Sequence, residues 1–265
     1  MGSSRVGFVG AGRMGFPMVE RLAAAGHDLV VYARRPEAAA SLDRLGVRPT
    51  SELAEVAAGA DVVLLCVFSD EQLAEVADPL AAALPDGAVF ASHVTGRASV
   101  LRSLAERFPA IEVVDAPVSG GPGEIAAGCL TVLLGGPPAA RAGAAEAVRA
   151  YADPVIETGE LGTALAVKLV NNFLFAANTQ VLAEAVWLGE QLGVVPAEML
   201  SALNHMSAGS QVSRRAAGAD MASFATRIGP FMKKDVAVCL EQAAELGIDP
   251  GLLIEVVRRG RLALI

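Results

Sequence analysis

The sequence predicts an α/β fold in its first part and an all-helical second part. Up to residue 158, short runs rich in β-branched residues alternate with Ala-rich helical stretches, which is typical of parallel βαβ units. Beyond that point no strand pattern follows. An apolar segment without proline, from Thr163 to Leu192, predicts one long helix that ends at Gly193 and Pro196. We therefore expect domains at 1–160 and 161–265, joined by this helix.

Six segments have the composition of buried strands, and the first opens into a glycine-rich turn. The expected strands are Arg5 to Val9, Leu29 to Tyr32, Asp61 to Val67, Ala88 to Ala91, Glu112 to Asp115 and Thr131 to Leu134. The first strand is followed by GxGxxG and then by a helical segment with Pro17 near its start. The residues of this turn are Gly10, Ala11, Gly12, Arg13, Met14 and Gly15.

In this strand–turn–helix context the three glycines have separate tasks. Gly10 permits the tight turn, Gly12 lets the backbone approach a pyrophosphate, and Gly15 allows the helix to pack on the strand. The N-terminus of the helix would face the phosphates. The sequence thus predicts a Rossmann dinucleotide-binding domain, against the alternative of a purely structural glycine turn.

The end of the second strand indicates which dinucleotide is favoured. An NAD site usually offers a carboxylate there to the ribose 2′-hydroxyl, but this chain has Ala33. Arg34 and Arg35 follow it, and two guanidinium groups suit a 2′-phosphate by charge and geometry. We therefore predict NADP(H). The alternative, that two arginines merely solvate a loop, is common but does not explain the missing carboxylate.

Composition excludes several other classes of function. The chain has 265 residues with 21 Lys and Arg against 29 Asp and Glu, a net charge of −8 that disfavours nucleic acid as a partner. Its longest uncharged stretch, Ile125 to Ala140, is too short and too rich in Gly and Pro to span a bilayer. Three scattered cysteines and three histidines provide neither a disulfide framework nor a metal motif, so we expect no metal. The start lacks an apolar signal region, and we expect a cytoplasmic protein.

A lysine and an asparagine lie one turn apart in the most apolar portion of the long helix. Lys168 and Asn172 share one helical face, so an ammonium and a carboxamide could hold the same substrate oxygen. A lysine in apolar surroundings can also have its pKa lowered toward neutrality, which suits an acid/base in hydride transfer. The alternative is a lysine that extends out of a buried helix beside a satisfied core amide.

Two further segments carry groups that suit an anionic substrate. Asp115-Ala116-Pro117-Val118-Ser119-Gly120-Gly121 follows a strand, and its small residues leave backbone amides accessible to a carboxylate. Lys233-Lys234-Asp235 begins an apparent helix in the second half, where one lysine could reach the cofactor or the substrate. By itself this second segment is a surface charge pair.

Four motifs in this order resemble the β-hydroxyacid dehydrogenase family, which includes 3-hydroxyisobutyrate dehydrogenase and related semialdehyde reductases. They are residues 7–18 around the glycine turn, the loop from Asp115 to Gly121, residues 168–172, and Lys234-Asp235. The resemblance covers nearly the whole chain. It implies that Lys168 is the essential catalytic residue with Asn172 as its partner, that Ser119, Gly120 and Gly121 bind the carboxylate of the substrate, and that Lys234 lies near the nicotinamide.

The resemblance also implies a helical second domain that helps to form homodimers or homotetramers, and this chain departs from the family pattern at several positions. Val67 and Phe68 stand where Leu-Pro is usual after the third Rossmann strand. This change alters the side chains that line the cofactor site. His93 stands where Thr is frequent beside the nicotinamide; it is a cofactor contact, a proton-active group or a packed loop histidine. The chain ends at Ile265, before the usual C-terminal segment, so we expect part of the helical closure to be absent.

The function predicted from these features is NADP(H)-dependent interconversion of a small β-hydroxyacid, similar to 3-hydroxyisobutyrate, and its semialdehyde or keto acid. The first alternative is an NADPH-dependent imine reductase, an architecture that resembles this family but commonly carries Asp or Tyr at the position of Lys168. The second is a non-catalytic NADP-binding module, whose members typically lose this lysine.

Overall fold

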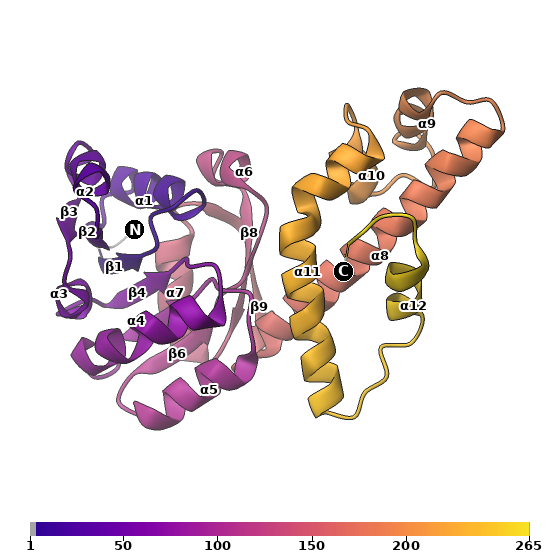
Figure 1. Ribbon diagram of the computed structural model, residues 1–265. Coiled ribbons are helices and arrows are strands. Elements are labelled where there is room, and N and C mark those ends of the chain that lie inside the picture. Colours follow the sequence, from indigo (N-terminus) through magenta and orange to yellow (C-terminus); the bar gives the residue numbers. More distant parts are fainter. Residues whose placement is uncertain (1–3, 265) are drawn as a thin grey trace. The chain divides into compact units, whose positions relative to one another are not determined.

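The computed structural model describes residues 4–264, and its internal contacts divide the chain into two compact units (Figure 1). The first unit extends to Lys168 and the second begins at Leu169, so the division falls inside one helix. The first unit is α/β and the second is helical, which confirms the predicted fold class.

The first unit is built on one sheet of nine strands with helices between them. The strands are β1 (Arg5–Val9), β2 (Asp28–Tyr32), β3 (Arg48–Thr50), β4 (Val62–Leu65), β5 (Val89–Ser92), β6 (Glu112–Asp115), β7 (Val118–Ser119), β8 (Leu130–Gly135) and β9 (Ala152–Gly159). The helices are α1 (Gly15–Ala24), α2 (Pro36–Asp43), α3 (Leu53–Ala57), α4 (Asp70–Ala83), α5 (Ala98–Arg107), α6 (Pro122–Ala126) and α7 (Pro138–Val148).

Strand order defines where a ligand can bind. Six parallel strands run in the order β3-β2-β1-β4-β5-β6, and the direction of winding reverses between β1 and β4. In sheets of this topology ligands bind beyond the carboxyl ends of the strands at that switch point. Next to β6, β8 runs antiparallel; it pairs antiparallel with β7 and parallel with β9.

Three strands were not among those expected from the sequence. They are β3, which has only three residues and includes Pro49, β7, which has only two residues, and β9, which includes Pro154 and exposes much of its length. Proline interrupts a strand pattern because it cannot donate to the ladder. These strands form through long-range pairing with β2 and β8, which a local pattern does not report.

Two apolar clusters cover the two faces of the sheet. Val6 and Phe8 of β1 belong to one cluster together with Met18 of α1, whereas Val9 belongs to the other together with Leu73 of α4. Successive strand residues point to opposite faces, so a strand with helices on both faces is apolar throughout. The sheet is therefore buried on both sides, and its loops at the carboxyl edge remain for binding.

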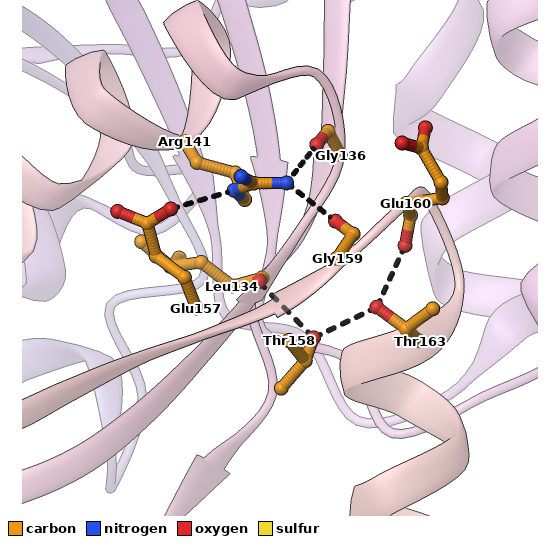
Figure 2. Close-up of polar contacts among 8 residues, drawn as sticks. All are labelled: Leu134, Gly136, Arg141, Glu157, Thr158, Gly159, Glu160 and Thr163. Carbon is orange, nitrogen blue, oxygen red and sulfur yellow. Dashed lines mark hydrogen bonds and ion pairs between the residues drawn. The ribbon is translucent and has the colours of Figure 1, made fainter.

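The long helix α8 (Thr163–Gln191) starts in the first unit, where a polar network holds its first turn (Figure 2). The Thr158 hydroxyl donates to the Leu134 carbonyl at 3.1 Å and lies 2.8 Å from the Thr163 hydroxyl, which also donates to Glu160. Beside it, Arg141 of α7 binds the Glu157 carboxylate and the carbonyls of Gly136 and Gly159. The last strands and the start of α8 are thus one connected framework.

The second unit consists of the remainder of α8 and four further helices. These are α9 (Pro196–Leu203), α10 (Gln211–Ala216), α11 (Met221–Glu245) and α12 (Leu252–Arg259). Phe173 of α8 packs in a cluster with Val236 of α11 and Ile254 of α12. The Gln180 amide donates to the carbonyls of Val257 and Leu262 and accepts from the Leu262 N–H, so it fixes the end of the chain on α8.

Residues 4–264 contain neither a membrane-spanning helix nor a cluster of metal ligands. No helix in this range combines the length and the apolar character that a membrane span requires. Nor do three His, Cys, Asp or Glu side chains gather within it as a metal site would need.

Candidate functional site

The glycine turn after β1 has the geometry of a phosphate cradle. Gly10 has φ +100°, and a Cβ there would lie 2.3 Å from the Cys66 carbonyl oxygen. A Cβ on Gly15 would lie 2.1 Å from the Gly10 carbonyl oxygen, so α1 can approach β1 only with glycine at this position. A Cβ on Gly12 would instead meet no atom within 4 Å. Two glycines therefore serve packing, and the third faces the space that a pyrophosphate needs.

The rest of the turn is consistent with that ligand. Arg13 is exposed, whereas Ala11 and Met14 are half-buried against the core. Over the described length of α1, no side chain caps the N-terminus and no acidic residue occupies the first turn. No side chain of this turn therefore neutralises the positive end of the helix dipole, which fits an anionic cofactor group.

The predicted selectivity residues lie at the carboxyl end of β2. Ala33 is half-buried, and its N–H donates to the Thr50 carbonyl of β3 at 2.8 Å. Arg34 and Arg35 follow it and are exposed, with Arg35 at the N-cap of α2. Two cations therefore lie at the strand end where a Rossmann site receives the adenosine ribose.

The residues after β4 form the next part of this edge. Val67 is half-buried against the sheet cluster that includes Leu73, and Phe68 is 48% exposed while its N–H donates to the Gln72 side chain at 2.9 Å. Before them, burial raises the pKa of the Cys66 thiol to about 12, so this thiol is neutral at physiological pH.

His93, directly after β5, is only 5% exposed and has partners at both ring nitrogens. Its Nδ1 lies 2.5 Å from the Ala116 carbonyl oxygen, and its Nε2 lies 2.8 Å from the Tyr151 hydroxyl. A carbonyl only accepts, so Nδ1 carries the proton, and Nε2 accepts from the tyrosine. Burial lowers the pKa of His93 to about 4, opposed by the bond to Ala116. The ring is therefore neutral and both of its nitrogens are bonded inside the protein, and the His93 N–H donates to the Leu65 carbonyl at 2.8 Å.

Asp115, the last residue of β6, is fully buried and connects two parts of the candidate site. One carboxylate oxygen accepts from the Gly162 N–H at 2.8 Å and the other accepts from the Leu165 N–H at 2.7 Å. Burial raises the pKa of Asp115, and these amide bonds oppose the rise. Asp115 thus holds the start of α8 against the strand that opens the Ser119 loop. The sequence alone does not predict this role of Asp115, because its partners lie about 50 residues away.

The loop after β6 presents the three residues predicted to bind a carboxylate. Ser119 is half-buried in β7, and Gly120 has φ +137°. The Gly121 N–H already donates to the Glu124 side chain at 2.9 Å, at the start of α6. Ser119 and Gly120 are therefore better placed than Gly121 to receive a substrate carboxylate in this arrangement.

Lys168 and Asn172 lie on α8 as predicted, one turn apart. Lys168 is half-buried at the end of the first unit, three residues beyond the Leu165 amide that Asp115 binds. The division of the chain falls directly after it.

Within the second unit, Asn172 belongs to a buried polar network. Its amide donates to one oxygen of the Asp235 carboxylate at 2.5 Å, and Lys234 pairs with the other oxygen at 2.9 Å. The Asn171 side-chain amide donates to the Asn172 side-chain oxygen Oδ1 at 2.9 Å. Asp235 therefore orients both the carboxamide and the second lysine that sequence analysis placed at the site, although its own role was not predicted.

Comparison with known proteins agrees with this geometry. Residues 5–162 match the family model of the NAD-binding domain of 6-phosphogluconate dehydrogenase, and residues 162–260 match the model described as NAD-binding of NADP-dependent 3-hydroxyisobutyrate dehydrogenase. The mouse mitochondrial 3-hydroxyisobutyrate dehydrogenase is 33% identical over 77% of this chain and 62% of its own length. An L-threonate dehydrogenase of Cupriavidus necator is 32% identical over 78% of this chain and 72% of its own length.

Among solved structures, the Mycobacterium tuberculosis 3-hydroxyisobutyrate dehydrogenase with L-serine has the same fold. Its TM-score is 0.85 at 24% identity, over 97% of this chain and 92% of that one. The matched ranges together cover most of both units, and they include the residues at the carboxyl edge of the sheet and on α8 described above. The chain belongs to the 3-hydroxyisobutyrate dehydrogenase family of NAD(P)-dependent oxidoreductases.

Proposed function

We propose that this protein is an NADP(H)-dependent oxidoreductase that interconverts a small β-hydroxyacid, similar to 3-hydroxyisobutyrate, and its semialdehyde or keto acid. The observation that carries the proposal is the Asp115 carboxylate. It ties the strand that opens the Ser119–Gly121 loop to the first turn of α8, which presents Lys168 one turn later. An ammonium and a carboxylate-binding loop are the two groups that reduction of a carboxylate-bearing carbonyl requires from the protein.

In this mechanism the reduced nicotinamide, when bound, supplies hydride to the carbonyl carbon. Lys168 donates a proton from Nζ to the carbonyl oxygen in reduction and removes it from the hydroxyl in oxidation. The Ser119 hydroxyl and the Gly120 N–H hold the carboxylate of the substrate. Asn172, oriented by Asp235, uses its remaining amide N–H to hold the reacting oxygen.

Selectivity for NADP(H) rests on Arg34 and Arg35. Both are exposed at the end of β2, and the half-buried residue before them, Ala33, offers no carboxylate to a ribose 2′-hydroxyl. The description of the second family model as NADP-dependent supports the same cofactor. Replacing both arginines by Ala should weaken NADPH by about 1 to 3 kcal/mol per lost charge-assisted contact while NADH changes little. Arg44→Ala, an exposed arginine beyond the end of α2, is the matched control.

A substrate panel with NADPH and NADH in parallel tests the proposed reaction. The panel contains small aldehydes and keto acids that carry a carboxylate, together with one cyclic imine. Turnover of a carboxylate-bearing carbonyl supports the proposal, whereas turnover of the imine alone supports an imine reductase. NADPH binding without any turnover would support a non-catalytic module.

The role of Lys168 needs its own variant. Lys168→Ala should abolish turnover while the dissociation constant of NADPH stays within about twofold, because acid/base catalysis contributes about 100-fold or more to rate. Lys233→Ala removes an exposed lysine of the second unit and serves as the control. A Lys168→Ala enzyme that kept most of its rate would contradict the assigned role.

We also propose that the protein forms a homodimer through α8. Exposed apolar side chains recur on this helix at a spacing of seven residues: Leu174, Val181 and Leu188 are 46%, 55% and 54% exposed. Such a repeat places the three side chains on one face, as in helices that pair with a second helix. A two-fold axis would bury this face against its copy.

A further inference from the structure

His93 and Tyr151 form a buried pair that the reaction proposed above does not use. Tyr151 lies between α7 and β9, is fully buried, and meets the His93 ring edge-on, with ring centroids 6.0 Å apart. The chemistry of hydride transfer needs neither group, so their hydrogen bonds require another explanation.

The ring of His93 acts at the point where β5 and β6 separate. The last main-chain hydrogen bond between these strands runs from the Ala116 N–H to the Ser92 carbonyl at 2.7 Å. The next carbonyl, that of Ala116, is buried, and the Val94 N–H that would continue the parallel ladder donates instead to the Ser92 hydroxyl at 3.3 Å. His93 Nδ1 supplies the donor for this carbonyl at 2.5 Å. A side chain thus extends the tie between the two strands by one residue.

This tie lies directly before the loop that carries Ser119 and Gly120. The Ala116 carbonyl is three residues from Ser119, and it is the last main-chain atom before the loop that is held from the β5 side; the next carbonyl, that of Pro117, accepts from the Leu133 N–H of β8 at 3.0 Å. The other side of the histidine is fixed by the Tyr151 hydroxyl, which donates to Nε2 at 2.8 Å and so keeps the proton on Nδ1. Without that donor the ring could adopt the tautomer that has no proton for Ala116.

We propose that His93 is a positioning residue: through the Ala116 carbonyl it sets the Ser119–Gly120 loop for the carboxylate of the substrate, with Tyr151 fixing its tautomer. The expected change in kinetics rests on the proposed function, whereas the hydrogen bond from His93 to the Ala116 carbonyl does not. Loss of the tie should raise KM for the carboxylate substrate and leave kcat and the NADPH dissociation constant nearly unchanged.

Three variants separate this role from simple packing. His93→Asn keeps a donor in place of Nδ1, because the amide nitrogen of asparagine is separated from Cα by the same number of bonds. His93→Leu keeps apolar bulk without a donor. Tyr151→Phe keeps the tyrosine ring and removes only the hydroxyl that fixes the tautomer, and it provides the test if His93→Leu does not fold.

The first measurement is amide hydrogen exchange over residues 118–121 in the full chain without cofactor, and it needs no substrate. His93→Leu should speed exchange of this loop by about tenfold, the equivalent of about 1.4 kcal/mol from one lost hydrogen bond, while β1 and β4 keep their protection. His93→Asn should restore most of the protection, and Tyr151→Phe should show a smaller change in the same loop.

The second measurement is steady-state kinetics of the same variants with the substrate found in the panel. We expect KM for the carboxylate substrate to rise about tenfold in His93→Leu and to recover in His93→Asn. Equal loop exchange in wild type and His93→Leu, or equal damage in the Leu and Asn variants, would overturn the proposal. If no substrate of the panel is turned over, the proposed function fails, and loop exchange alone decides the role of His93.

Discussion

Acidification is expected to destabilise the first unit through His93. Burial lowers the pKa of this histidine to about 4 in the folded protein, against an ordinary value of 6.5. The unfolded chain therefore binds a proton at a higher pH than the folded protein does. The contribution of neutral His93 to the stability of the folded protein is present above pH 6.5 and is lost as the pH falls toward 4.

The size of the effect follows from these two values. Between pH 7 and pH 5, a group with a pKa of 6.5 in the unfolded chain and about 4 in the folded protein lowers the free energy of unfolding by about 2 kcal/mol. Asp115 acts with the opposite sign, because burial raises its folded pKa and acidification then favours the folded state. Wild type and His93→Asn both contain Asp115, so the contribution of Asp115 cancels when these two proteins are compared.

Urea denaturation of wild type and His93→Asn at pH 7 and pH 5 isolates the histidine. The variant has no titrating group at this position, so wild type should lose about 2 kcal/mol more than the variant between the two pH values. His205→Asn, at an exposed histidine of the second unit, controls for loss of a histidine as such. Equal losses in wild type and His93→Asn would refute the assignment of a neutral, buried ring.

Three further predictions concern the groups that position the site. Asp115→Asn should lower the free energy of unfolding by about 1 to 3 kcal/mol in urea denaturation, because the new amide nitrogen would face the N–H of Gly162 or of Leu165, and both of these now donate to a carboxylate. Asp235→Asn should lower kcat/KM about tenfold with NADPH binding unchanged, since one amide oxygen cannot serve both Asn172 and Lys234; unchanged kcat/KM would contradict this positioning role. Leu174→Glu with Val181→Glu should convert a dimer into a monomer in analytical ultracentrifugation, whereas Glu at the exposed Ala222 of α11 should not.

The parts of the site that the sequence predicted are those fixed by local backbone geometry. Gly10 and Gly15 are recognisable because a turn with φ +100° and a close helix–strand approach admit only glycine. Arg34 and Arg35 could be assigned to the end of β2 because that strand begins at a predictable distance after the turn. Lys168 and Asn172 share a helix face by their spacing alone.

The roles of His93 and Asp235 could not be predicted in the same way. The partners of His93 lie 23 and 58 residues away, and Asn172 is 63 residues from Asp235. Only the folded chain brings these groups together. A histidine after a strand was compatible with a cofactor contact, a proton-active group or a packed ring, and the Tyr151 hydroxyl is what distinguishes them.

Two hydrogen-bonded contacts with distant parts of the chain meet on adjacent residues at the end of β6. The Asp115 side chain holds the start of α8, and the Ala116 carbonyl is held by His93. If both ties restrain one segment, loss of the first already frees it and loss of the second costs less. The double variant Asp115→Asn, His93→Leu should then be less destabilised than the sum of the single variants, by about 0.5 kcal/mol or more in urea denaturation. Additive losses would show that the two ties act on independent segments, and that the Ser119 loop is not set by both.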